Sequence, residues 1–346
     1  MTESKLDLAG TCVFSESVPK KITANALPTA LEAPENYIIV SLDNGEIHTF
    51  DIHGTERKSL DGCRDAVWAL AVWNNLLASG GVENEVKVWD LKTGQNLQAL
   101  QGHTSTVRAL RFLSDGKRLI SASRDTSLRY WDLVSGKCLS VSTAHTGTIR
   151  SIALSASEDL LVSGSYDGTA CLWRVSDTEL VCLHTLRAKA GPIYCVAFND
   201  SAKQVVTAGS EAQVRVWNQE NGQLLAALEG NGSIVNQIRL RGSTLVTSDA
   251  SGYISIWSLS ETPELISRLH AHSSSVACLD FDGSRIVSAD AEGSVILTNG
   301  ETGTLLGNLS QNSEAVWKVA FGSEHTVVAI LRREGKVLLE VRNLEI

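Results

Sequence analysis

The chain is poor in the residues that several classes of protein require. Its 346 residues include 5 prolines and 1 methionine, and no apolar run reaches the ~20 residues of a membrane-spanning helix. The 7 cysteines are scattered without a CxxC pair, which argues against a disulfide scaffold or a zinc site and favours a reducing compartment. The opening MTESKLDLAG does not read as a signal peptide. We therefore expect a soluble protein of the nucleus or cytoplasm, with no membrane association, metal or cofactor.

Positive charge is also scarce, because the formal net charge at pH 7 is −9. An acidic chain lacks the broad basic field that nucleic acids attract, so nucleic-acid binding is disfavoured. Any site for an anionic ligand has to be a local cluster of cations. The length and the 43% hydrophobic content suit a large core, and the length alone would suggest two domains.

An internal repeat predicts the architecture instead. Tryptophans near the ends of short apolar runs recur roughly every 40–45 residues, the period of a four-stranded propeller blade. The series comprises Trp89, Trp131, Trp173, Trp217 and Trp257, continues to Phe50 and Thr298, and ends with a unit near Arg342.

Each unit reads as short alternating strands separated by turn residues, with almost no helical period. We predict an all-β fold: a single propeller over residues 1–346 with eight blades. Seven blades is the alternative, since the first and last units are degraded. The N-terminal GTCVFSE is expected to add the outer strand to the last blade, beside VLLEVRN, because that pairing covers exposed strand edges.

The third unit carries the residue types of a hydrolase triad. His103, Ser121 or Ser123, Asp125 and Trp131 would instead form a hydrogen-bonded chain that satisfies buried polar groups. The pattern recurs in the next unit with His145, Asp167 and Trp173, which indicates structure rather than catalysis. No G-x-S-x-G, P-loop or metal-ligand spacing occurs, so we predict that the protein is not an enzyme.

The repeat units carry different residue types at two sets of equivalent positions. Five residues after the His103 position, on the innermost strand, stand Thr23, Trp68, Arg108, Arg150, Tyr194, Asn236, Ala277 and Trp317. Seven residues before the Trp131 position stand Asp43, Val82, Arg124, Tyr166, Ser210, Ala250 and Ala291.

These positions lie at one end of the blades, so Arg108, Arg124 and Arg150 should converge on blades 3 and 4. Three guanidiniums repel one another unless an anion lies among them, and their planar forks match phosphate oxygens. A phosphoserine or phosphothreonine is the simplest such ligand. The alternative is that each arginine pairs with a nearby carboxylate. Lys87, Arg129 and Arg215 are expected to form a solvated strand face, and Arg332 and Arg333 could add to the cationic rim.

GHTSTVRAL, SASRDTSLRYWD, AHTGTIRSI and SGSYDGT, with AVWKVAF and VVAILRRE near the end, resemble the WD40 propeller of the F-box/WD40 substrate receptors, the fungal cell-division-control and animal archipelago type. The resemblance covers nearly the whole chain. It implies a receptor for a phosphodegron, a phosphorylated Ser/Thr-Pro peptide that marks a protein for ubiquitination. It assigns phosphate binding to Arg108, Arg124, Arg150, Ser105, Thr106 and Tyr166, and peptide pockets to Trp68 and Tyr194. Arg333 and Trp317 would be outlying members.

Some positions depart from the family. Asn84 stands where the family has an arginine, so a second phosphate would be held less tightly, and Lys189, Asn231 and Ser251 replace His or Asp and suggest looser blades. No F-box is recognisable, so ubiquitin-ligase subunits would be contacted only through regions outside this chain. We predict a phosphodegron-binding module of an SCF-type E3 ubiquitin ligase. The alternative is a WD40 scaffold that does not recognise phosphate.

Overall fold

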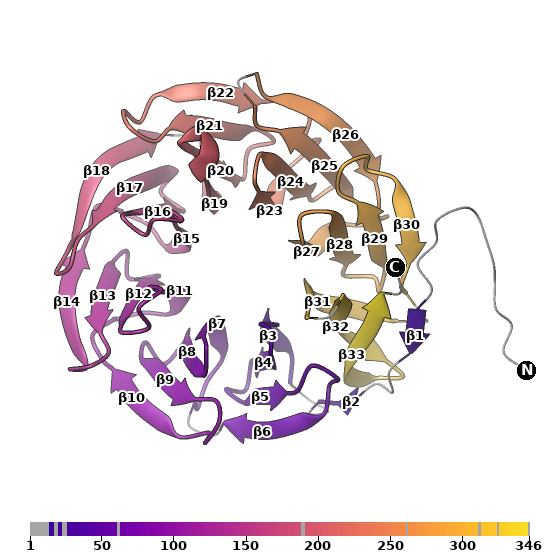
Figure 1. Cartoon of the computed structure of the whole chain (residues 1–346), viewed down its shortest axis with the longest axis horizontal. Helices are drawn as coiled ribbons and strands as arrows, with labels where there is room; N and C mark the ends of the chain where they lie inside the picture. The colour runs from indigo at the N-terminus through magenta and orange to yellow at the C-terminus, as the bar shows by residue number, and fades with distance from the viewer. Residues whose placement is uncertain are drawn as a thin grey trace, which may run out of the picture.

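The computed structural model describes residues 14–16, 20–22, 26–60, 63–187, 191–260, 262–310, 313–323 and 325–344. In this part of the chain eight antiparallel sheets follow one another around a common axis (Figure 1). The only helical element described is one 3-10 turn, η1 (Asp200–Ala202), so no described helix could cross a membrane. The predicted all-β propeller with eight blades is confirmed, and the count of seven is excluded.

The first strand of each blade lies nearest the axis and the last forms the rim (Figure 1). Blade 1 has β3 (Pro28–Glu32), β4 (Ile38–Leu42), β5 (Ile47–Phe50) and β6 (Glu56–Leu60). Blade 2 has β7 (Val67–Trp73), β8 (Leu76–Gly81), β9 (Val86–Asp90) and β10 (Asn96–Leu100). Blade 3 has β11 (Val107–Phe112), β12 (Arg118–Ser123), β13 (Leu128–Asp132) and β14 (Lys137–Ser142). Blade 4 has β15 (Ile149–Leu154), β16 (Leu160–Ser165), β17 (Thr169–Val175) and β18 (Leu180–Arg187).

The second half of the ring repeats this order. Blade 5 has β19 (Ile193–Asn199), β20 (Gln204–Gly209), β21 (Val214–Asn218) and β22 (Leu224–Leu228). Blade 6 has β23 (Val235–Arg241), β24 (Thr244–Asp249), β25 (Tyr253–Ser258) and β26 (Glu264–His270). Blade 7 has β27 (Val276–Phe281), β28 (Arg285–Asp290), β29 (Val295–Asn299) and β30 (Leu305–Asn308). Blade 8 has β31 (Ala315–Phe321), β32 (Thr326–Arg333) and β33 (Lys336–Leu344), and both β1 (Phe14–Glu16) and β2 (Lys20–Lys21) pair with β33.

Blade 8 therefore combines strands from both ends of the described chain. β1 runs antiparallel to β33, with Phe14 opposite Leu344, at the edge of the sheet. One hydrophobic cluster joins this blade to blade 1, since Val328 of β32 packs in the same core as Ile38 of β4. The ring is closed by apolar burial between blades 8 and 1 as well as by strand pairing.

Small residues allow neighbouring blades to approach closely near the axis. A Cβ added to Gly80 would lie 2.7 Å from a methyl group of Val107 in the next blade. A Cβ added to Gly164 would lie 2.8 Å from Ile193 in the same way. The run of small residues that ends the second strand is thus a packing requirement of the ring.

Blades 3 and 4 contain the predicted hydrogen-bonded chain. In blade 3, His103 Nδ1 lies 2.8 Å from Asp125, and its Nε2 lies 2.7 Å from the Ser121 hydroxyl, which also accepts the Trp131 indole N–H at 2.8 Å. Burial alone would raise the pKa of Asp125, but hydrogen bonds from His103, Ser127 and a backbone N–H outweigh it and hold that pKa far below its usual range. The residues His145, Asp167, Ser163 and Trp173 repeat the chain in blade 4.

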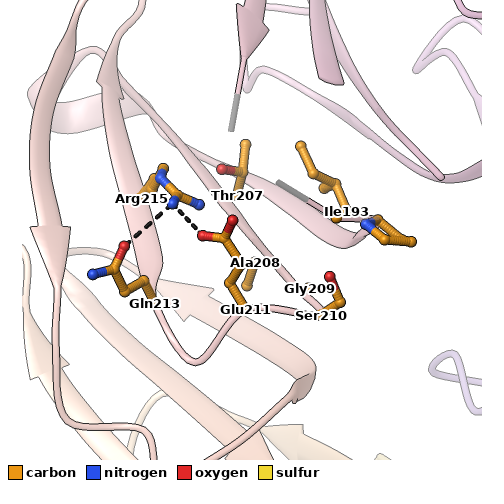
Figure 2. A pocket seen from close by; sticks show the side chains of 10 residues that line it. Ile193, Thr207, Ala208, Gly209, Ser210, Glu211, Gln213 and Arg215 are labelled. Atoms are coloured by element: carbon orange, nitrogen blue, oxygen red, sulfur yellow. Dashed lines mark hydrogen bonds and ion pairs between the residues drawn. The ribbon is translucent and has the colours of Figure 1, made fainter. Parts of the chain in front are cut away.

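In blades 2 and 5 an ion pair stands where blades 3 and 4 have the His–Asp pair. The prediction that Lys87 and Arg215 are solvated is therefore wrong. Their relative exposures are 8% and 6%. Lys87 Nζ lies 2.7 Å from Glu83, and Arg215 bonds to Glu211 and Gln213 (Figure 2). In blade 2, Cys63 stands where blade 3 has His103. Because Cys63 is smaller, the long side chain of Lys87 on β9 takes the place of the imidazole beside Glu83. Arg129 of blade 3 is half-buried and lies 5.9 Å from the Trp131 ring.

In blades 6 and 7 the buried carboxylate belongs to an aspartate at a different position of the repeat. Asp249 Oδ1 accepts the Ser251 N–H at 2.8 Å, and in blade 7 Asp290 lies 3.4 Å from His272 Nδ1. Both aspartates end the second strand, two residues before the position of Asp125 in blade 3. Asn231 accepts a hydrogen bond from the Thr247 hydroxyl at 2.8 Å. These blades thus keep a buried aspartate despite Ser251, but their polar groups are satisfied less completely, since Asn231 Nδ2 and His272 Nδ1 are buried without a hydrogen bond.

Two residues singled out in the sequence lie outside the described residues, Thr23 and Lys189. In blade 1 the strand register places Thr29, not Thr23, at the position of Trp68 and Arg108, because Pro28 pairs with Leu42 as Val107 pairs with Ser123.

The contribution of the buried ion pair of blade 5 to stability can be tested by breaking the pair. Arg215→Met leaves Glu211 without its main cationic partner in a largely dehydrated site, and we expect the free energy of unfolding to fall by about 2–3 kcal/mol. The matched control is Arg241→Met, which removes an exposed arginine at the end of β23, outside the arginine cluster, and should change stability by less than about 0.5 kcal/mol. Urea denaturation of both variants measures the difference, and equal stabilities would contradict the structural role of Arg215.

Candidate functional site

The site lies where the inner strands of blades 3 and 4 begin. Arg108 and Arg150 are the second residues of β11 and β15, each at an irregularity in the strand register that recurs at the start of every inner strand. Such a bulge re-aims a side chain out of the regular ladder. Arg124 directly follows β12, and its backbone N–H donates to the Thr106 carbonyl at 2.8 Å. The backbone therefore places all three arginines at the same end of adjacent blades.

Aromatic rings border two of these arginines. The Arg108 guanidinium lies 5.0 Å from the Trp68 ring, and the Arg150 guanidinium lies 5.4 Å from the Tyr194 ring. Arg150 also donates to the Tyr166 hydroxyl at 3.1 Å, and the Tyr166 and Tyr194 rings meet edge to face at 5.6 Å. These contacts hold the guanidiniums by stacking, which leaves most of their N–H groups available to a ligand.

Electrostatics show that the arginines are close enough to repel one another. Burial lowers the pKa of Arg108, and the positive charges of Arg150 and Arg124 lower it further. Among the described residues, no carboxylate lies within ion-pair distance of Arg108, Arg124 or Arg150. Within the described part of the chain, the cluster is therefore a concentration of positive charge without a counter-ion.

Several other arginines in the described part of the chain have carboxylate partners. Arg118 lies 2.7 Å from Asp115, and Arg239 lies 3.1 Å from Asp280. At the end of β32, Arg333 lies 3.4 Å from Glu340, and its neighbour Arg332 lies 3.5 Å from a further acid, Glu314. Arg333 is thus already paired within blade 8.

The remaining predicted site residues fall into two groups. Ser105 and Thr106 lie between blades 2 and 3, half-buried, and their carbonyls accept hydrogen bonds from the Ser123 hydroxyl and the Arg124 N–H. Within the described part of the chain, neither of their own hydroxyls has a hydrogen-bond partner. Trp317 instead packs against the core between blades 8 and 1.

A cavity of about 300 Å³ opens beside Arg150. Arg150, Tyr166 and Tyr194 line one side of it, and Ala277 and Ala291 of blade 7 line the other. Its lining also includes Gln237, one position after the aligned Asn236, and Ser275, two positions before the aligned Ala277, so comparison of the aligned positions did not select them. The Gln237 side chain donates to the Ala277 carbonyl and accepts the Leu279 N–H, both on β27, so it holds the cavity wall in place.

The described residues give no sign of other chemistry. No group of three or more His, Cys, Asp or Glu side chains in that part of the chain could hold a metal ion. The His103 chain is satisfied internally, which leaves no activated serine. A β-propeller of this kind is typically a non-enzymatic interaction scaffold, and its function depends on the site that it carries.

Comparisons with known proteins agree with the fold. A family model described as "IFT122 first beta-propeller" matches residues 73–340, and one described as "WD domain, G-beta repeat" matches residues 54–90. The crystal structure of the computationally designed Ika8 protein is similar, with a TM-score of 0.81 and 27% identity, over 91% of this chain and 96% of that one.

Two curated relatives are similar in sequence. Cell division control protein 4 of Saccharomyces cerevisiae is 26% identical over 372 residues, which covers 94% of this chain and 48% of that protein. The F-box/WD repeat-containing protein sel-10 of Caenorhabditis elegans is 29% identical over 161 residues, covering 42% of this chain and 27% of that protein. The chain thus spans about half the length of the first relative.

The unpaired arginines should lower the stability of the ligand-free protein. We expect Arg108→Met, which keeps an apolar side chain against Trp68 and removes one charge, to raise the free energy of unfolding by roughly 0.5–1 kcal/mol at low ionic strength. The gain should shrink at about 0.5 M salt, where repulsion between the charges is screened. Urea denaturation at both salt concentrations measures it. A loss above about 1 kcal/mol would mean that Arg108 has a stabilising partner inside the protein.

Proposed function

The chain belongs to the WD40-repeat β-propeller family, and we propose that it binds a phosphorylated serine or threonine of a protein ligand through Arg108, Arg124 and Arg150. The observation that carries the proposal is the absence of a carboxylate partner for these three arginines among the described residues, beside Arg118, Arg239 and Arg333, which are paired. A ligand anion would supply the counter-ion that the described residues do not.

Phosphate fits this cluster better than a carboxylate does. A phosphorylated side chain carries about −1.5 to −2 charges and three acceptor oxygens, whereas a carboxylate carries one charge. Arginine forks bind such oxygens in pairs, and charge-assisted hydrogen bonds are stronger than neutral ones. The Tyr166 hydroxyl and the unengaged hydroxyls of Ser105 and Thr106 provide further donors at the same end of the blades.

The surroundings of the cluster suit a peptide around the phosphate. Trp68, beside Arg108, is 39% exposed and presents an apolar face on which a proline ring can pack. Tyr194 lines the 300 Å³ cavity on the other side, where a neighbouring side chain can enter. We propose a Ser/Thr-Pro phosphopeptide as the ligand.

A second phosphate near blade 2 is not favoured. Asn84 stands in the turn after β8, and the adjacent Glu83 is bonded to Lys87, so this turn adds no free cation. The ligand phosphate is therefore assigned to the cluster on blades 3 and 4.

The biological role we propose is substrate recognition for an SCF-type ubiquitin ligase. The similarity to cell division control protein 4 and to the F-box/WD repeat-containing protein sel-10 supports it. Contacts with ligase subunits would be made by regions other than this propeller, and the protein would act in the nucleus or cytoplasm. The propeller itself would carry no catalytic activity.

The test is fluorescence anisotropy with a labelled peptide that contains Leu-Leu-pThr-Pro, beside its unphosphorylated twin. We expect micromolar or tighter binding that requires the phosphate and weakens with salt. Arg150→Ala should weaken it by more than about tenfold, since a hydrogen bond to a charged group contributes roughly 1.5–3 kcal/mol.

Arg118→Ala is the matched control, because that arginine is paired with Asp115 away from the cluster, and it should leave binding unchanged. Equal binding of both peptides, or of neither, would refute phosphate recognition. A scaffold that does not recognise phosphate would then be the better description.

A further inference from the structure

A second cavity lies at the opposite end of the inner strands from the arginine cluster. Its volume is about 480 Å³, in the range of small-molecule sites, and its walls come from blades 1 to 4. Arg108 is the second residue of β11, whereas the cavity is lined by the end of that strand and by Ser114 beyond it. Since a strand advances about 3.3 Å per residue, roughly 20 Å of chain separate Arg108 from Ser114. This cavity is therefore distinct from the site proposed for phosphate.

Comparison of the blades explains why this end of the ring is hollow. The position of Arg111 on the inner strand is occupied, from blade 1 onward, by Glu32, Ala71, Arg111, Ala153, Ala197, Arg239, Asp280 and Ala320. In blades 6 and 7 the charged residues are neighbours, and Arg239 lies 3.1 Å from Asp280. In blades 1 and 3 the charged residues are separated by blade 2, whose small Ala71 leaves the space between them open.

The acid and the base on either side of Ala71 lack counter-ions. Among the described residues, the Glu32 carboxylate has no hydrogen-bond or ion-pair partner, and no carboxylate lies within ion-pair distance of Arg111. Arg111 donates to the backbone carbonyl of Leu110 at 2.8 Å. Burial raises the pKa of Glu32 and lowers the pKa of Arg111, and the charge of each partly offsets the effect of burial on the other. A ligand that supplies counter-charges would stabilise both ions.

The rest of the lining is apolar or already hydrogen-bonded. Trp73 and Phe112 contribute ring surface, and the Trp73 indole N–H donates to the Ser114 carbonyl at 3.0 Å. Glu158 accepts the Ser114 N–H and the Ser114 hydroxyl, both at 2.8 Å. As far as the chain is described, the cavity thus combines one unpaired acid, one unpaired base and an apolar wall.

We propose that this cavity binds a free α-amino acid with an apolar or aromatic side chain. Its ammonium bonds to Glu32 and its carboxylate to Arg111, while its side chain packs against the Trp73 and Phe112 rings. An α-amino acid carries both charges on one carbon, so a single small molecule compensates both unpaired ions. A ligand with only one charge leaves the other ion uncompensated. The inference goes beyond the proposed phosphopeptide site, because the two sites share no residue.

The test is isothermal titration calorimetry of the wild-type protein with phenylalanine and its blocked derivatives. N-acetylphenylalanine lacks the ammonium, phenylalanine amide lacks the carboxylate, and N-acetylphenylalanine amide lacks both charges. We expect free phenylalanine to bind more than about tenfold more tightly than each derivative, because each block removes a charge-assisted contact. Glycine, which has no side chain to pack on the rings, should also bind at least about tenfold more weakly.

Two variants assign the binding to this cavity. Glu32→Gln and Arg111→Gln should each weaken the binding of free phenylalanine by more than about tenfold. Acetylation of the ligand should then matter less than about twofold in Glu32→Gln, and amidation less than about twofold in Arg111→Gln, since the partner of the blocked group is already lost. The controls are Glu264→Gln and Arg187→Gln, which change exposed residues of the rim strands β26 and β18 and should not alter binding. Thermal unfolding shows whether each variant is folded, and the ligand series with wild type tests the proposal without them.

The possible outcomes separate this inference from its alternatives. If none of phenylalanine, leucine and tryptophan binds, or if free and doubly blocked phenylalanine bind equally, the inference is wrong. Tighter binding of N-acetylarginine amide would instead mean that the cavity takes a basic side chain of a partner protein. Unchanged binding of phenylalanine in both folded variants would place the amino acid elsewhere and overturn the site. The phosphothreonine peptide is titrated separately, so its failure to bind would contradict only the proposed function.

Discussion

Polar groups buried between the strands need partners in their own blade or, as for Thr29 and Ser41 of blade 1, in the next one, and the rest of the structure depends on this constraint. The indole N–H of Trp131 needs an acceptor, its acceptor Ser121 also bonds to His103, and His103 needs Asp125. An unpaired group in such a place would cost about 1–3 kcal/mol. Blades 2 to 7 supply the main partner in three ways: a His–Asp pair, a Lys–Glu or Arg–Glu pair, and an aspartate two residues earlier on the second strand. The third way is the least complete, since His272 Nδ1 has no hydrogen bond.

The same constraint distinguishes two kinds of cation in the described part of the chain, those with a carboxylate partner and those without one. Where a lysine or arginine serves the fold, as Lys87 and Arg215 do, a glutamate from the neighbouring turn bonds to it. Arg108 and Arg150 are stacked on aromatic rings instead, and no carboxylate in the described part of the chain neutralises them. A protein holds like charges together at a cost in stability, and such local strain is characteristic of ligand-binding sites. The division between paired and unpaired cations is the physical basis of the proposed phosphate site.

The fold could be predicted from sequence because its signals repeat. The spacing of Trp89, Trp131 and Trp173 predicts the blades, and comparison of aligned positions brings Arg108 and Arg150 to one place. Side-chain partners could not be predicted where a blade departs from the pattern. Lys87 reads as a surface residue of an alternating strand, and only the replacement of the histidine by the smaller Cys63 hints that it turns inward.

Pairing across strands also escaped prediction. Only the structure reveals that Arg333 is paired with Glu340, because the partner comes from the adjacent strand β33.

The most direct measurement of the central idea is a phosphorus NMR titration of the phosphothreonine peptide, free and bound to the wild-type protein. A phosphate monoester has its second pKa near about 6, and an opposite charge within a few ångströms favours the charged form. If the phosphate lies among Arg108, Arg124 and Arg150, its second pKa should fall by about one unit or more on binding. An unchanged pKa in the bound peptide would show that the phosphate remains in solvent, and the arginine cluster would not be a phosphate site.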